Sequence, residues 1–272
     1  MSSWNLPFSY EFEGREVRYG IQGEGVPVVL VHGTPWSSFN LRHLIKGLSS
    51  YYKVYYFDLL GYGSSDKSEA DVSLGIQNRL LDSLIDYWQI EKPFIVGHDF
   101  GGTTVFRNHI LDKRDFYKIV VIDPVALSPW GSPFFKHIEK YEMAFSAVPD
   151  YIHLAIVEAY IKTAAHQKLN QTTIDGILAP WCGVQGKSAF YRQIAQADSK
   201  FTDDFQEKFN EVRSPVLILW GEEDTWIPCK QGNELQRKIE NSKLVTIPNA
   251  GHLVIEEKPE ILVQEILKFF QS

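Results

Sequence analysis

PFIVGHDFGG, at residues 93–102, joins a short apolar run to a glycine-rich turn that leads into a helix-like segment. The run Pro93–Val96 has the continuous apolarity of a strand that is buried on both faces. The turn fits the pattern glycine-X-nucleophile-X-glycine, in which small residues flank a strained position that lifts one side chain above a sheet. Asp99 occupies that position. We therefore expect a catalytic carboxylate at Asp99, the alternative being a plain turn in which Asp99 caps the following helix.

Similar apolar runs lie on both sides of this segment: Val26–Val31, Lys53–Phe57, Lys118–Ile122, Pro215–Trp220 and Lys243–Ile247. Helix-like stretches lie between several of them, and in Ser73–Trp88 the apolar residues recur every 3.6 residues. Strands that alternate with helices predict an α/β fold, with a mostly parallel central sheet flanked by helices. The alternating segment Tyr10–Tyr19, around Gly14, predicts an antiparallel hairpin at the edge of that sheet.

The alternation of strands and helices stops after Ile122. From about residue 129 to residue 197 the chain is aromatic-rich and helix-like, without a convincing buried strand, and the strand pattern resumes at Pro215. This predicts a helical cap inserted between two strands. We expect the first part of the core at residues 1–128, the cap at residues 129–200 and the second part of the core at residues 201–272.

Composition and charge narrow the functional classes. The chain has 272 residues, 44% of them hydrophobic and 22% charged, as in an ordinary soluble globular protein. Its net charge of −7 argues against nucleic acid or an anionic membrane surface as a partner. The start of the chain has no basic region followed by an apolar stretch, and no apolar run approaches the roughly 20 residues that span a bilayer. We therefore expect a cytoplasmic protein that acts on a small molecule, and the oligomeric state stays open.

The two cysteines, Cys182 and Cys229, lie far apart in the sequence. They form neither a zinc-binding pattern nor a disulfide framework. We therefore expect a free, buried thiol at each position. We also expect neither a metal nor a cofactor.

Reactive residues are expected where parallel strands end, because chemistry in an open parallel sheet sits at the carboxyl ends of its strands. Thr34 follows Val26–Val31 in the sequence His-Gly-Thr-Pro. A glycine followed by X-Pro forces a sharp turn, which can aim the Thr34 N–H into a cavity as an oxyanion hole requires. The N–H of Phe100, next to Asp99, is the second expected donor. The alternative for the first segment is a plain loop in which Ser37 or Ser38 caps a helix.

The last two strands end near an acid and a histidine. Asp224 lies just past Pro215–Trp220 and can orient an imidazole, although Glu222–Asp224 also fits a solvated acidic turn, and Asp123 is a rival acid. His252 follows Lys243–Ile247 on a short loop, where a structural histidine is the alternative. The order Asp99, Asp224, His252 favours a catalytic role for these three residues, because nucleophile, acid and histidine follow one another in this order in the α/β-hydrolase fold.

With these motifs the chain resembles the α/β-hydrolase superfamily over nearly its whole length. The motifs that carry the resemblance are His32–Pro35, Asp58–Ser65, Gly97–Gly102 and Gly251-His252. More narrowly, the chain is similar to the branch with an aspartate nucleophile, which contains epoxide hydrolases, haloalkane dehalogenases and fluoroacetate dehalogenases. A carboxylate is already nucleophilic and suits displacement at a saturated carbon.

The resemblance implies a two-step hydrolysis. Asp99 would form an alkyl ester, and His252, held by Asp224, would activate the water that attacks the ester. The N–H groups of Thr34 and Phe100 would stabilise the resulting oxyanion.

The resemblance also bears on the leaving group. Haloalkane dehalogenases usually have Asn at the position of Thr34 and Trp at the position of Phe100. Fluoroacetate dehalogenases carry Arg at the positions of Phe100 and Thr103. Neither pattern is present. Epoxide hydrolases use two tyrosines of the cap, and the segments around Tyr141 and Tyr191 are similar to theirs.

We therefore expect an epoxide hydrolase-like enzyme with Tyr141 and Tyr191 as acids, although an aromatic-rich cap also contains tyrosines by chance. One alternative is a hydrolytic dehalogenase that uses the same Asp99. Others are an ester or lactone hydrolase, a non-hydrolytic lyase and a ligand-binding receptor.

Overall fold

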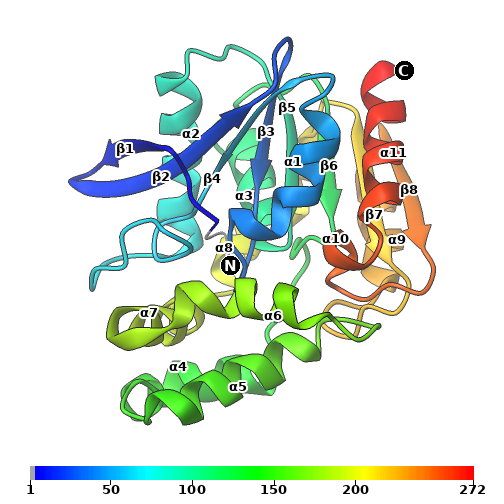
Figure 1. Cartoon of the computed structure of the whole chain (residues 1–272). Coiled ribbons are helices and arrows are strands. Elements are labelled where there is room, and N and C mark those ends of the chain that lie inside the picture. Colours follow the sequence, from blue (N-terminus) through cyan, green and yellow to red (C-terminus); the bar gives the residue numbers. More distant parts are fainter. Residues whose placement is uncertain (1–3) are drawn as a thin grey trace.

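The computed structural model describes residues 4–272; residues 1–3, with which the predicted first part of the core begins, lie outside the described part. Eight strands form one sheet in the order β1-β2-β4-β3-β5-β6-β7-β8 (Figure 1). The strands are β1 (Phe8–Phe12), β2 (Arg15–Gln22), β3 (Pro27–Val31), β4 (Lys53–Phe57), β5 (Phe94–His98), β6 (Ile119–Ile122), β7 (Val216–Gly221) and β8 (Ser242–Ile247). The pairs β1–β2 and β2–β4 are antiparallel, and all other pairs are parallel. The predicted fold class is confirmed.

The central strands are apolar on both faces because helices cover both sides of the sheet. Every residue of β5 and of β7 is buried. Complete burial of one Val, Leu, Ile or Phe side chain contributes about 1.5–3 kcal/mol relative to exposure. The strand ends that carry the loops are therefore anchored in the most strongly stabilised part of the molecule.

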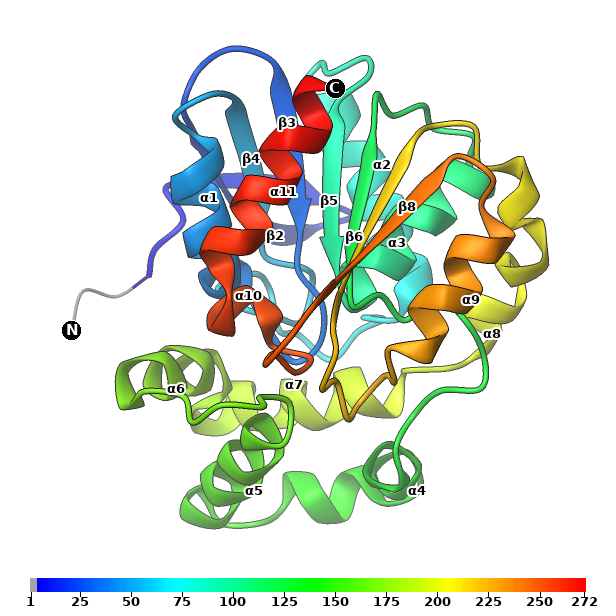
Figure 2. The ribbon, with the colours of Figure 1, turned by 90° about the vertical axis from the view of Figure 1, so that its right-hand side faces the viewer.

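Helices pack on both faces of the sheet. On one face lie α1 (Arg42–Leu48) and α11 (Pro259–Gln271), and on the other lie α2 (Leu74–Tyr87) and α3 (Phe100–Ile110) (Figure 2). The predicted 3.6-residue stripe of α2 is its buried face, which includes Leu80, Leu81 and Leu84. The shorter elements of the core are η1 (Ser38–Leu41), α8 (Lys200–Asp203), η3 (Gln206–Glu211), α9 (Lys230–Lys238) and α10 (Val254–Glu257).

Between β6 and β7 the chain forms further helices: α4 (Pro133–Ser146), α5 (Asp150–Lys162), α6 (Gln171–Leu178), η2 (Ala179–Trp181) and α7 (Gly183–Ala195). They form a layer across the carboxyl ends of the parallel strands, with α6 and α7 next to the core and α4 and α5 farther out (Figures 1 and 2). We call residues 129–200 the helical insertion. Its division from the core as a separate domain stays a prediction.

Both cysteines are free thiols, but Cys182 is exposed and Cys229 is only half-buried. The expectation that both thiols are buried was therefore wrong.

Within residues 4–272, no helix combines the length and the apolar composition needed to cross a membrane.

Candidate active site

Asp99 lies on the tight turn between β5 and α3. Its backbone has φ 54° and ψ −121°, a conformation that costs a residue other than glycine on the order of 1–3 kcal/mol. The turn depends on Gly101, where a Cβ atom would lie 2.1 Å from the carbonyl oxygen of Val31. Only glycine therefore lets the first turn of α3 approach β3 this closely, and this approach lifts Asp99 above the end of the sheet.

The two oxygens of the Asp99 carboxylate face different partners. Oδ1 accepts a hydrogen bond from the backbone N–H of Thr34 at 2.6 Å, and Oδ2 lies 3.1 Å from Nε2 of His252. Gly33 is required here, because a Cβ atom would lie 2.2 Å from Oδ1 and 2.6 Å from the nitrogen of Phe100. Phe100 is the first residue of α3, where a backbone N–H has no acceptor within the helix. The structure thus brings Asp99, Thr34 and Phe100 together.

His252 is held between two carboxylates. Its Nδ1 lies 2.8 Å from Oδ2 of Asp224, whose Oδ1 accepts the N–H groups of Trp226 at 2.7 Å and Ile227 at 2.8 Å. Burial lowers the pKa of His252, but the charges of Asp224 and then Asp99 outweigh burial, so the pKa stands well above its usual value. The two carboxylates therefore favour the protonated form of His252.

Asp123, the alternative acid, lies next to Asp224, with one oxygen of each within 4.8 Å of the other. Its Oδ1 accepts the N–H of Gly221 at 2.9 Å, and its Oδ2 has no hydrogen-bond partner among residues 4–272. Complete burial, and then the charge of Asp224, raise the pKa of Asp123 well above its usual value. Burial and the neighbouring charge therefore favour the protonated form of Asp123, and Asp224 is the acid in direct contact with His252.

The same three residues are spaced as metal ligands are. One oxygen each of Asp123 and Asp224 and one ring nitrogen of His252 lie within 4.8 Å of one another. However, Nδ1 of His252 is already paired with Asp224 at 2.8 Å, in the place that a metal would take. This donor set does not fit a metal centre.

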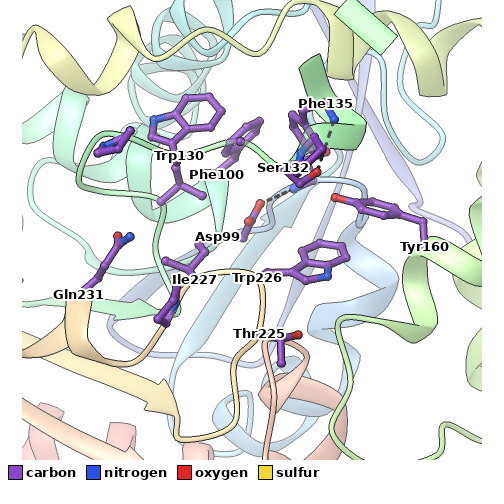
Figure 3. Close-up of a pocket in the computed structure, with 16 residues that line it drawn as sticks. Asp99, Phe100, Trp130, Ser132, Phe135, Tyr160, Thr225, Trp226, Ile227 and Gln231 are labelled. Carbon is purple, nitrogen blue, oxygen red and sulfur yellow. Dashed lines mark hydrogen bonds between the residues drawn. The ribbon is translucent and has the colours of Figure 1, made fainter. Parts of the chain in front are cut away.

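A cavity of about 370 Å³ opens above Asp99, between the core and the helical insertion (Figure 3). Its wall consists mostly of apolar and aromatic side chains: Phe100, Val125, Pro129, Trp130, Pro133, Phe135, Tyr160, Trp226, Ile227 and Pro228. Its polar lining comes from Thr34, Ser132, Thr225 and Gln231. Of all the described residues that line it, only Asp99 carries a charge. The cavity suits a small, uncharged, largely apolar molecule.

Neither tyrosine predicted as an acid lines this cavity. Tyr191 is completely buried, and its hydroxyl lies 3.0 Å from Nδ1 of His153. Tyr141 is 43% exposed and lies at a kink in α4. The structure does not bring this predicted pair into the cavity: the Tyr191 hydroxyl is bonded inside the insertion, and Tyr141 is not among the lining residues.

Tyr160 of α5 supplies the phenol that the cavity does contain, and its hydroxyl end is directed into the cavity (Figure 3). Its ring stacks on Trp226 at 4.4 Å between ring centroids, and Trp226 stacks on His252 at 5.0 Å. Burial, and then the charge of Asp99, raise the pKa of Tyr160 well above its usual value, so the phenol keeps its proton at neutral pH. Sequence reasoning missed Tyr160 because it has no motif around it.

The indole N–H groups of the two cavity tryptophans are engaged elsewhere. Trp130 donates to Oγ1 of Thr202 at 2.8 Å, and Trp226 donates to Oγ1 of Thr163 at 3.0 Å. These two donors are therefore not free for a ligand in the cavity.

Comparisons with known proteins agree with this architecture. The family model described as "Alpha/beta hydrolase family" matches residues 28–265. The chain is similar to an alpha/beta hydrolase fold protein from Burkholderia ambifaria of known crystal structure, with 44% identity, a TM-score of 0.95 and 98% of both chains covered.

Two curated relatives extend this likeness. "Uncharacterized hydrolase YugF" of Bacillus subtilis (strain 168) is 28% identical, over 90% of this chain and 89% of that protein. "Soluble epoxide hydrolase" of Corynebacterium sp. (strain C12) is 26% identical, over 94% of both. With a family model that spans most of the sequence, this chain belongs to the alpha/beta hydrolase family and is a hydrolase.

Proposed function

We propose that this hydrolase opens small, neutral epoxides through a covalent ester on Asp99. The observation that carries the proposal is the position of the carboxylate, between the N–H of Thr34 at 2.6 Å and Nε2 of His252 at 3.1 Å. A serine in this place would need His252 as a base before it could attack, whereas a carboxylate attacks directly.

In the first step, Oδ2 of Asp99 attacks a ring carbon of the epoxide. The new bond joins Oδ2 to that carbon, and the bond between the carbon and the ring oxygen breaks. The departing oxygen takes the proton of the Tyr160 hydroxyl, and the phenolate regains a proton from solvent. Positioned proton donation of this kind typically accelerates a reaction about 10²–10⁴-fold.

In the second step, His252 changes from an acid to a base. Esterification removes the charge of Asp99, one of the two charges that raise the pKa of His252, so the imidazolium releases its proton. Neutral His252 then takes a proton from water, and the hydroxide attacks Cγ of Asp99. The negative charge develops on Oδ1, where the N–H groups of Thr34 and Phe100 stabilise it. Collapse breaks the bond from Cγ to Oδ2, and the diol leaves with the proton of His252.

The lining of the cavity supports a neutral substrate. An anionic substrate would meet the charge of Asp99 without a lining cation to pair with. An oxygen leaving group is favoured over a halide. A halide needs N–H donors, but the indole N–H groups of Trp130 and Trp226 already donate to other residues. The phenol of Tyr160, in contrast, can protonate a departing oxygen. A relative carrying the name soluble epoxide hydrolase adds support.

The test is to trap the ester in a His252→Gln variant and to weigh the intact protein. An epoxide is expected to add its full mass to the protein. A haloalkane would add its mass less one hydrogen halide, which would point to the alternative dehalogenase. Asp99→Asn/His252→Gln is the control and should remain unmodified. Turnover at the wild-type rate by His252→Gln, or an adduct on the control, would overturn the proposal.

A further inference from the structure

One side chain of the helical insertion reaches the loop that carries Thr34. Gln193 of α7 is buried, and its Oε1 accepts hydrogen bonds from the Thr34 hydroxyl at 2.5 Å and the Tyr62 hydroxyl at 2.9 Å. Its Nε2 donates to the carbonyl oxygen of Phe190 at 3.0 Å. Every polar atom of this carboxamide is therefore engaged, at the junction between insertion and core.

The Phe190 carbonyl fixes which way the carboxamide faces. A carbonyl oxygen accepts but cannot donate, so the NH₂ end of Gln193 must face it. The oxygen of Gln193 is then left facing the two hydroxyls as an acceptor. Thr34 consequently has its side chain tied to α7 while its own backbone N–H points at Oδ1 of Asp99.

The insertion holds the same loop at a second point. The indole N–H of Trp181 donates to the carbonyl oxygen of Pro35 at 3.0 Å. Within the loop, the N–H of Trp36 donates to the carbonyl oxygen of Gly33 at 3.1 Å. Two side chains of the insertion thus form hydrogen bonds with the neighbouring residues Thr34 and Pro35. The loop that carries the Thr34 N–H is therefore held in place by residues outside the core.

We propose that Gln193 is a positioning residue, which fixes the Thr34 loop so that its N–H stays on Oδ1 of Asp99. This inference rests on the two-step function proposed above, and it predicts an unequal effect on the two steps. During ester formation the carboxylate loses charge, so a donor on Oδ1 gives no advantage to the transition state. During ester hydrolysis Oδ1 gains charge, and the donor stabilises that transition state.

The experiment compares the two rates in Gln193→Leu under single-turnover conditions, with the ester followed by intact mass after rapid quenching. A small epoxide that modifies the His252→Gln protein is the probe. We expect the ester to disappear roughly tenfold more slowly than in the wild type, while its formation changes less than twofold, so that the ester accumulates.

A matched control removes another glutamine contact between the insertion and the core. Oε1 of Gln196 accepts the N–H of Val72 at 2.7 Å, and neither residue lines the cavity that contains Asp99. Gln196→Leu should leave both rates unchanged. An equal slowing of both steps in Gln193→Leu, or the same split in Gln196→Leu, would overturn the proposal.

The hydrogen bond can also be removed from its other end. Thr34→Val keeps the backbone N–H and replaces the hydroxyl, which donates a hydrogen bond to Gln193, with a methyl group. This variant should also hydrolyse the ester slowly. It therefore tests the proposal even if Gln193→Leu fails to fold. The double variant should be no slower than the slower single variant, and additive effects would refute the route through the Thr34 hydroxyl. An ester that turns over normally in these variants counts against the role of Gln193. Failure of any ester to form in the wild type or in His252→Gln counts against the function itself.

Discussion

Replacing Tyr160 by Phe removes the phenol of the cavity and little else. The ring keeps its stack on Trp226, at 4.4 Å between centroids, and the hydroxyl, which lines the cavity, has no hydrogen-bond partner among residues 4–272 to lose. The variant should therefore fold as the wild type does. What it loses is the proton for the departing ring oxygen, and the loss of a positioned acid corresponds to about a 10²-fold or larger decrease in ring opening.

The matched comparison is Tyr191→Phe, which changes the tyrosine favoured by the sequence. The hydroxyl of Tyr191 lies on Nδ1 of His153, whose Nε2 is occupied by the carbonyl oxygen of Trp181 at 2.9 Å. Deleting this hydroxyl leaves a buried acceptor unpaired, at about 1–3 kcal/mol in the free energy of unfolding. Ring opening itself should proceed nearly as in the wild type.

The assay is the rate of ester formation by each variant in the His252→Gln background, alongside thermal melts. Formation is the step in which the ring oxygen departs, so it isolates the acid from the later hydrolysis. Unimpaired ring opening by Tyr160→Phe would refute the assignment of the acid. Equal impairment by Tyr191→Phe would refute the distinction between the two tyrosines. A substrate that loses halide needs no proton, so insensitivity to Tyr160→Phe with a haloalkane alone is consistent with the role of the phenol.

Three further predictions concern the charges and the turn around Asp99. Asp99→Asn imitates the uncharged ester, so the pKa of His252 should be lower than in the wild type when its ring is titrated by NMR, and an unchanged pKa would contradict the switch from acid to base. Asp224→Asn removes the largest charge that raises the pKa of His252, so it should shift the pH profile of ester hydrolysis to lower pH and slow the plateau. Asp123→Asn should shift the profile little, because burial already favours the uncharged form of Asp123. Gly101→Ala places a Cβ atom 2.1 Å from a carbonyl oxygen, so it should abolish folding or lower the melting temperature strongly, and a melting temperature like that of the wild type would be contrary to the tight turn.

The sheet was largely predictable because its strands carry their own signal. Continuous apolar runs placed β4 with the observed bounds and β5 within two residues, since a strand buried on both faces has no polar position. The strand ends then bring Asp99, Asp224 and His252 together, because parallel strands deliver their loops to the same edge.

The insertion was predictable as helical but not in its orientation. Which faces of α4, α5 and α7 turn toward Asp99 depends on how these helices pack on one another and on the core, and an aromatic-rich segment marks no single inward stripe. Tyr141 and Tyr191 were therefore chosen by local similarity, and neither lines the cavity. Tyr160 and Gln193 face the core for reasons of packing that no short motif records.

Isotope labelling in a single turnover tests most directly whether a covalent ester forms on Asp99. The wild-type protein, in excess over an epoxide that it opens, reacts once in water enriched in ¹⁸O. If Asp99 attacks the epoxide, the product of this first turnover carries the unlabelled oxygen of Asp99, and the label appears in the peptide that contains Asp99. Label in the product of the first turnover, with an unlabelled Asp99 peptide, would mean that water attacks the substrate directly and would contradict a covalent ester on Asp99.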